Sequence, residues 1–185
     1  MSIYILLSAS IGVVLFISVC VQVLGGKPQN LASWILFTLI TGVAAASVIV
    51  QKGNYPIALV WAIGNGVVSF CIFKSSIFRW TWLENTVVLL VLICLVVWDV
   101  SGAKAATVAA SIAFLTACLP QLRDTYRKPG NTSVVIYFGY SVAGMLSVIA
   151  GKDWSVEQRL FPVVIVVLNL AVAATAARKF WLKLD

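Results

Sequence analysis

The sequence predicts an all-α integral membrane protein with seven transmembrane helices, arranged as two parallel three-helix repeats joined by a linker helix. Composition is the first reason: 62% of the 185 residues are hydrophobic and only 10% are charged, with a mean hydropathy of +1.04. A soluble domain carries about a quarter charged residues. The second reason is a series of apolar runs close to the ~20 residues that cross a bilayer. The third is an internal duplication.

Reading the apolar runs against their polar breaks predicts spans at residues 3–24, 34–51, 56–73, 83–100, 105–123, 133–151 and 160–179. The first run has no basic segment before it and is long enough to cross, so we interpret it as a span and not as a cleaved signal peptide. The fourth run is uninterrupted from Val87 to Trp98, which favours lipid contact. Glycines and hydroxyls interrupt the third and sixth runs, as is typical of helix–helix contacts.

The distribution of basic residues predicts the orientation. Cytoplasmic connections of membrane proteins carry an excess of Lys and Arg. With the N-terminus outside, the inner set is Lys27, Lys74, Arg79, Arg123, Arg127, Lys128, Arg178, Lys179 and Lys183, and the outer set is Lys52, Lys104, Lys152 and Arg159. We therefore expect the N-terminus outside and the C-terminus in the cytoplasm. Short loops and the lack of a targeting signal favour a bacterial inner membrane.

The duplication is read from motifs about a hundred residues apart. Lys27-Pro28-Gln29-Asn30 aligns with Lys128-Pro129-Gly130-Asn131, and Ser47-Val48-Ile49 aligns with Ser147-Val148-Ile149. Three spans per repeat is an odd number, so two repeats lie parallel only if one further crossing separates them. The sequence thus predicts a first repeat at 1–74, a linker helix at 75–104 and a second repeat at 105–185.

Pro120-Gln121 at the end of a span, followed by a basic loop and Asn131-Thr132-Ser133, resembles the PQ-loop motif. The three-plus-one-plus-three plan is similar to that of the SWEET, SemiSWEET and PQ-loop (MtN3-like) transporter superfamily. The first repeat departs from the motif, with Val21-Gln22 in place of Pro-Gln. The resemblance implies alternating access, with a substrate site at the interface of parallel repeats near the midplane.

Polar side chains inside spans are the candidates for solute binding, because a polar group in hydrocarbon needs a partner. Asn65 and Asn169 fall at corresponding places in the third and seventh spans, and the resemblance implies that this asparagine pair holds substrate. Alternatively, each amide bonds a neighbouring helix backbone. Trp61 lies one helical turn before Asn65 and either walls the site or faces lipid or core. Ser47, Ser147 and Tyr140 are further candidates, although small hydroxylated residues are also common at helix contacts.

Gln22, Pro120 and Gln121 are interpreted as hinge residues. Proline removes one helical hydrogen bond, and a nearby amide can satisfy the carbonyl that is released. We expect these residues to bend the first helix of each repeat and not to bind solute.

Several classes of function are excluded on composition. The chain has no histidine, and its four cysteines, Cys20, Cys71, Cys94 and Cys118, are scattered in apolar runs without metal-ligand spacing. No nucleophile–base pair or phosphate loop is present, so we expect no enzyme, no cofactor and no metal. The cations are dispersed at span ends, which argues against nucleic acid. All six acids, including Asp124 after the Pro-Gln pair, lie at span ends or in loops, which disfavours proton coupling.

The expected function is passive uniport of a small polar neutral solute, with a sugar as the first candidate. Alternatives are another small metabolite, either an amino acid or a vitamin resembling nicotinamide riboside, and a non-transporting scaffold or receptor-like subunit. The expected partners are this solute and the lipid bilayer, and a homo-oligomer is possible.

Overall fold

The computed structural model of the chain describes residues 2–26, 31–74 and 82–182. These residues are almost entirely helical and contain no strand. The helices are α1 (Ile3–Leu24), α2 (Leu31–Val50), α3 (Pro56–Phe73), α4 (Trp82–Ala117), α5 (Leu119–Arg127), α6 (Val134–Ala150) and α7 (Phe161–Leu182), with a 3-10 turn η1 (Pro129–Asn131) and a π-helical turn η2 (Val156–Leu160). Within the described ranges, five helical stretches are long and apolar enough to cross a membrane, and α6 is a shorter apolar helix.

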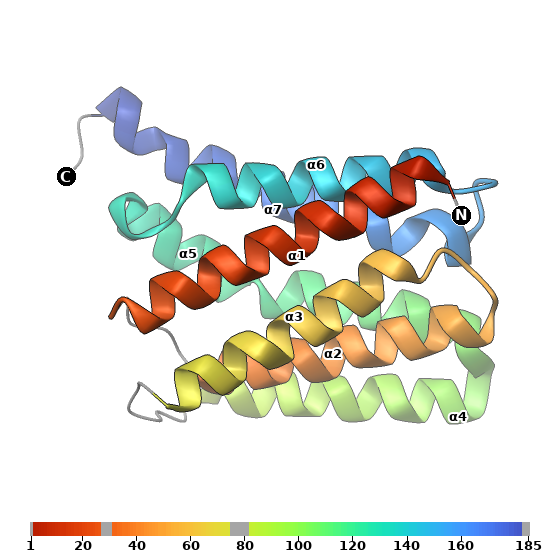
Figure 1. Cartoon of the computed structure of the whole chain (residues 1–185). Helices are drawn as coiled ribbons and strands as arrows, with labels where there is room; N and C mark the ends of the chain where they lie inside the picture. Colours follow the sequence, from red (N-terminus) through yellow and green to blue (C-terminus); the bar gives the residue numbers. More distant parts are fainter. Residues whose placement is uncertain (1, 27–30, 75–81, 183–185) are drawn as a thin grey trace.

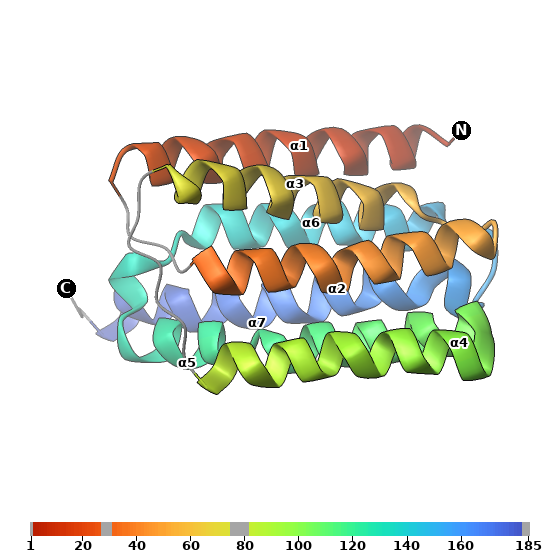
Figure 2. The same ribbon diagram turned by 90° about the horizontal axis from the view of Figure 1, so that it is seen from below.

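The long helices lie side by side along one axis and form an elongated bundle (Figures 1 and 2). One end of the bundle holds residues 51–55, Gly102 and residues 151–160, and is called the Gly102 end below. The opposite end holds the start of α2, the end of α3 and the short helix α5, and is called the Gln121 end. Helix α1 begins at the Gly102 end, and α7 finishes at the Gln121 end (Figure 1).

Helix α4 consists of two arms that meet at Gly102. The backbone of Gly102 is not helical, with φ 80° and ψ 178°. Positive φ values in this range favour glycine, which has no Cβ to clash with the backbone. The chain doubles back at this point, so that the arm after Gly102 returns along the bundle toward α5 (Figures 1 and 2). The polar break predicted at residues 101–104 coincides with this reversal.

The packing of the helices forms two groups. Helix α3 lies between α1 and α2, and α7 contacts both α5 and α6. Two further contacts join these groups: α1 packs against α6, and α2 packs against α4. Close approach of α1 and α3 depends on Gly64, because a Cβ at this position would collide with the ring of Phe16.

The outer faces of the bundle are apolar. Large hydrophobic side chains are exposed along the helices, for example Val14 on α1 (60%), Ile63 on α3 (59%) and Val96 on α4 (61%). An apolar surface of this extent has no favourable contact with water but matches the hydrocarbon of a bilayer. The chain therefore has the composition and surface of a multi-pass membrane protein.

The predicted element bounds agree with the structure at some positions and differ at others. α1 and α3 begin and end at the predicted residues, whereas α2 begins at Leu31, before the predicted start at 34. The span predicted at 105–123, with a bend expected at Pro120, is divided in the structure, because α4 ends at Ala117 and α5 begins at Leu119. Pro120 lies in the first turn of α5 and has no N–H to continue the preceding helix. The repeat motif at 27–30 lies outside the described residues.

Candidate functional site

A small cavity lies inside the bundle and receives side chains from all seven α-helical elements or their caps. Its volume is about 50 Å³. The lining residues are Phe16, Trp34, Phe37, Trp61, Asn65, Phe114, Cys118, Gln121, Tyr137, Tyr140, Leu168, Asn169 and Val172. Seven of these thirteen side chains are aromatic, three are amides, and none is charged. The cavity can therefore offer flat apolar faces and neutral hydrogen-bonding groups to a ligand.

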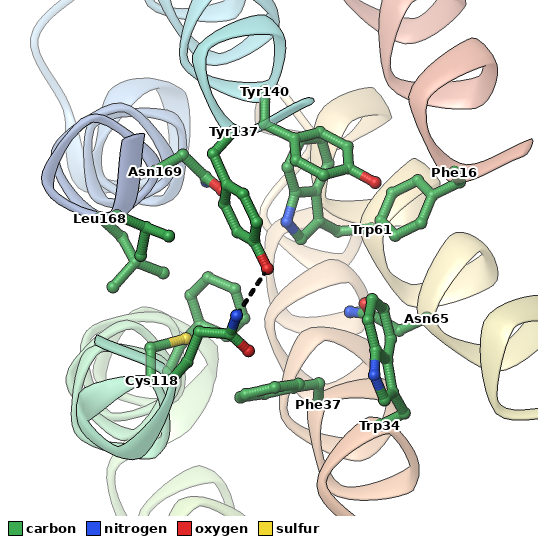
Figure 3. Close-up of a pocket in the computed structure, with 13 residues that line it drawn as sticks. Phe16, Trp34, Phe37, Trp61, Asn65, Cys118, Tyr137, Tyr140, Leu168 and Asn169 are labelled. Atoms are coloured by element: carbon green, nitrogen blue, oxygen red, sulfur yellow. Dashed lines mark hydrogen bonds between the residues drawn. The ribbon is translucent and has the colours of Figure 1, made fainter. Parts of the chain in front are cut away.

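Asn65 and Asn169 line the cavity from opposite sides (Figure 3). Both residues are almost completely buried, at 4% and 5% exposure. The Asn65 Nδ2 lies 3.4 Å from the Thr41 Oγ1 on α2, and the Asn169 Nδ2 donates to the Ile165 carbonyl at 2.8 Å. An amide has two N–H donors and an acceptor oxygen. These bonds therefore use only part of the hydrogen-bonding capacity of the two amides.

Trp61, Tyr140 and Phe16 form an aromatic cluster on one side of the cavity. The ring centroids of Trp61 and Tyr140 are 4.8 Å apart, and Phe16 lies 5.3 Å from Trp61 and 5.1 Å from Tyr140. The Tyr140 hydroxyl is buried and has no hydrogen-bond partner within the described part of the chain. Buried tyrosine hydroxyls normally find a partner. This hydroxyl is thus available to a ligand or a bound water.

A second aromatic cluster covers another wall of the cavity. Trp34 and Phe37 lie 6.4 Å apart on α2, and Phe37 lies 5.9 Å from Phe114 on the second arm of α4. These rings were not predicted from the sequence. A usable signal was their spacing, because Trp34, Phe37 and Thr41 share one face of α2 and Thr41 contacts Asn65.

Gln121 enters the cavity from the first turns of α5. Its Nε2 donates to the Tyr137 hydroxyl at 2.9 Å, a bond drawn in Figure 3. From the sequence, Gln121 is expected to satisfy backbone groups at a hinge and to take no part in binding. In the structure it bonds to a tyrosine of α6 beside the cavity. Gln121 therefore lies just after the break between α4 and α5 and also lines the cavity.

Gln22, Ser47 and Ser147 are not among the lining residues. Gln22 is half-buried on α1 and takes part in side-chain contacts. Ser47 is fully buried, and its Oγ lies 2.9 Å from the Thr107 Oγ1. Ser147 is equally buried, and its carbonyl and hydroxyl both accept from the Asn54 amide. The two serines share a matching place in sequence, but they lie at contacts between helices near the Gly102 end.

Across the described ranges, no group of three or more His, Cys, Asp or Glu side chains is positioned to hold a metal ion. Cys20, Cys71, Cys94 and Cys118 form no disulfide within the described part of the chain. The groups that the cavity presents to a ligand are ring faces and neutral amides.

Comparison with family models, with curated proteins and with solved structures gave no match to this chain.

Proposed function

We propose that the protein is a membrane transporter that moves a small polar neutral solute by alternating access. The observation that carries this proposal is the position of Asn65 and Asn169. They come from matching places in the two predicted repeats, and both line one cavity inside the bundle. A binding site at the interface of parallel repeats, related by an axis along the membrane normal, is a known transporter plan.

The packing of the helices supports the division into two three-helix repeats. In the proposed scheme α1, α2 and α3 form the first repeat, and the second arm of α4 with α5, α6 and α7 forms the second. In each repeat the last helix, α3 or α7, contacts the other helices of that repeat. Between the repeats, the first helix of one contacts the second helix of the other, as α1 does with α6 and α4 does with α2. In this scheme the arm of α4 before Gly102 is the linker crossing between the two repeats.

We place the protein in the SWEET and PQ-loop superfamily as part of this proposal. The support is the Pro120-Gln121 pair at a break between helices and the lining position of Gln121. We also propose that the Gln121 end faces the cytoplasm of a bacterial inner membrane, because Arg123, Arg127 and Lys128 are exposed there.

A sugar remains the first candidate solute, since ring faces and amides together suit a hydroxylated ring. The number of aromatic side chains supports a second candidate, a flat heterocyclic ring of the nicotinamide riboside type. An amino acid fits less well, because no charged group lines the cavity to balance its carboxylate and ammonium groups. The lining also contains no carboxylate or histidine that could relay protons, which favours passive movement over proton coupling.

The cavity is too small for any of these solutes in its present form. A volume of about 50 Å³ holds only a few water molecules, since one ordered water needs roughly 10 to 15 Å³. Solute entry therefore requires the two repeats to move apart at one end. The structure corresponds to a closed or nearly closed stage of the proposed cycle.

Uptake by liposomes containing the purified protein tests the proposal. A panel of sugars, nucleoside-like vitamins and amino acids is compared with empty liposomes, and at least one solute is expected to enter faster than in the empty vesicles. Asn65→Ala and Asn169→Ala are each expected to reduce this uptake strongly, while Asn85→Ala removes an amide from an exposed position and leaves uptake unchanged. Flux equal to that of empty vesicles for the whole panel would favour the scaffold or receptor-like alternative.

A further inference from the structure

The Gly102 end of the bundle is held together by polar contacts between the two proposed repeats. Residues 51–55 connect α2 to α3, and residues 151–160 connect α6 to α7. These are the same connection in the two repeats, and they meet each other directly. The contacts fall into two groups, one around Asn54 and one around Gln51.

Asn54 inserts its side chain into the second repeat. It is buried, and its Nδ2 donates to the Ser147 carbonyl at 2.8 Å and to the Ser147 Oγ at 3.1 Å. The Asn54 backbone N–H donates to the Glu157 carbonyl at 3.0 Å. Gly53 beside it approaches that carbonyl so closely that a Cβ would collide with it. This connection is thus fitted closely against the second repeat.

Gln51 makes the second group of contacts with the arm of α4 that follows Gly102. Its Nε2 donates to the Thr107 Oγ1 at 2.8 Å and to the Ala103 carbonyl at 3.2 Å. The Ser47 Oγ lies 2.9 Å from the same Thr107 hydroxyl. Two neighbouring regions of the first repeat therefore bond to two different helices of the second.

The 151–160 connection is braced by Arg159. Its Nη2 donates to the Gly151 carbonyl at 2.8 Å, and its guanidinium carbon lies 4.1 Å from the centroid of the Trp154 ring. A guanidinium over an indole face is favourable. These contacts of Arg159 hold the 151–160 connection in the conformation in which the Glu157 carbonyl accepts from the Asn54 backbone N–H.

The junction nevertheless contains several unmet polar groups. The buried atoms Asn54 Oδ1, Ser155 Oγ, Glu157 Oε2 and Arg159 Nε have no hydrogen-bond partner within the described residues. A partly satisfied polar network is costly in a low-dielectric interior, and water would satisfy these atoms if the two connections separated. Closure thus makes the bonds of Asn54 and Gln51 but leaves other polar atoms unsatisfied that water satisfies on opening, and this balance is expected of a contact that both closes and opens.

The cavity lies on the other side of this junction, since its lining includes Trp34, Cys118 and Gln121 toward the Gln121 end. We propose that the contacts of Asn54 with Ser147 and of Gln51 with Thr107 form a gate that closes the cavity at the Gly102 end. These contacts must break when the cavity opens to that face of the membrane. The role in transport rests on the proposed function, but the closure itself can be tested without knowing the solute.

Cys118 provides the reporter, because it is a native thiol in the lining of the cavity. The full chain is expressed with Cys20→Ala, Cys71→Ala and Cys94→Ala, so that Cys118 is the remaining cysteine. A charged, membrane-impermeant methanethiosulfonate reagent is applied to spheroplasts and, separately, to inside-out vesicles, and the rate of Cys118 modification is measured at each face. Gel filtration of the purified variants confirms that each is folded.

Asn54→Ala and Thr107→Ala are expected to raise the rate of Cys118 modification from the Gly102 face about tenfold, because each removes ordinary hydrogen bonds from the closed state. Thr116→Ala is the matched control. Thr116 lies on the same arm of α4, is exposed, and bonds only to the carbonyl of Ile112 in its own helix; its rate should equal that of the parent.

Rates for both Asn54→Ala and Thr107→Ala equal to that of Thr116→Ala would overturn the gate. If such a result accompanies normal solute uptake, the gate alone is refuted. If the rates rise as expected but no solute is taken up by the parent chain, the gate stands and the proposed transport function falls.

Discussion

The cavity and the Gly102-end junction use the same kinds of polar side chain in opposite ways. At the junction, Gln51 and Asn54 each donate to at least two acceptors on other helices. In the cavity, Asn169 bonds only within its own helix, and the buried Tyr140 hydroxyl has no partner in the described chain. Asn65 and Gln121 line the cavity and also bond to neighbouring helices, so the difference lies in how much hydrogen-bonding capacity is left for a ligand. Rarity in an apolar span does not distinguish the two uses.

The largest expected effect is on the affinity of the cavity for solute. The double variant Asn65→Ala with Asn169→Ala removes both amides, and each hydrogen bond to solute contributes about 1 to 2 kcal/mol. Solute affinity should therefore fall by roughly a hundredfold. Equilibrium binding to the purified protein measures this loss, and an unchanged affinity would show that the solute does not contact the amides.

Gly53→Ala is expected to have the next largest effect, at the junction. The added Cβ collides with the Glu157 carbonyl, and the strain of such overpacking costs about 1 to 3 kcal/mol. The closed state should lose stability, seen as faster modification of Cys118 from the Gly102 face. Gly42→Ala is the control, because no atom lies within 4 Å of a Cβ built there. Equal rates for the two variants would remove Gly53 from the junction.

Tyr140→Phe should alter binding and stability in opposite directions. The hydroxyl is buried without a protein partner, so its removal is neutral or stabilises the fold by up to about 1 kcal/mol. A solute that bonds the hydroxyl should bind about five- to tenfold more weakly. Thermal unfolding in detergent and equilibrium binding measure the two effects, and a marked fall in unfolding temperature would indicate that the hydroxyl has a structural partner.

Ser47→Ala is expected to have the smallest effect on binding. Ser47 contacts Thr107 and lies outside the cavity lining. The substitution should cost the junction about 1 kcal/mol or less and leave the affinity for solute within twofold of the parent. A tenfold loss of affinity would show that Ser47 belongs to the binding site after all.

Much of the helical plan could be predicted because the bilayer fixes the length of a span. Runs such as Ile3–Leu24 and Pro56–Phe73 end where polar residues begin, and the polar break around Gly102 predicted the reversal inside α4. The break between α4 and α5 lies beside the bend expected at Pro120 and Gln121, but its position at Cys118 was not predicted, because Cys118 lies within an apolar run.

The site was predicted only in part. Asn65, Asn169, Trp61 and Tyr140 were found because large polar or amphipathic groups are rare in spans, and all four line the cavity.

Phe37 was missed because residue type alone does not show which face of an apolar helix turns inward, and only its spacing from Trp34 and Thr41 marks it. In sequence it cannot be told from Phe70, which is 61% exposed. Ser47 and Ser147 were grouped with the cavity for the same reason, since helix rotation and packing decide which neighbour a hydroxyl meets.

A structure of the protein with a transported solute bound is the most direct test that two copies of one helix triplet share a single binding site. The account predicts solute between Asn65 and Asn169, hydrogen-bonded to both amides and in contact with the Trp61 ring. Solute bound elsewhere, with both amides still engaged only with protein groups, would contradict it.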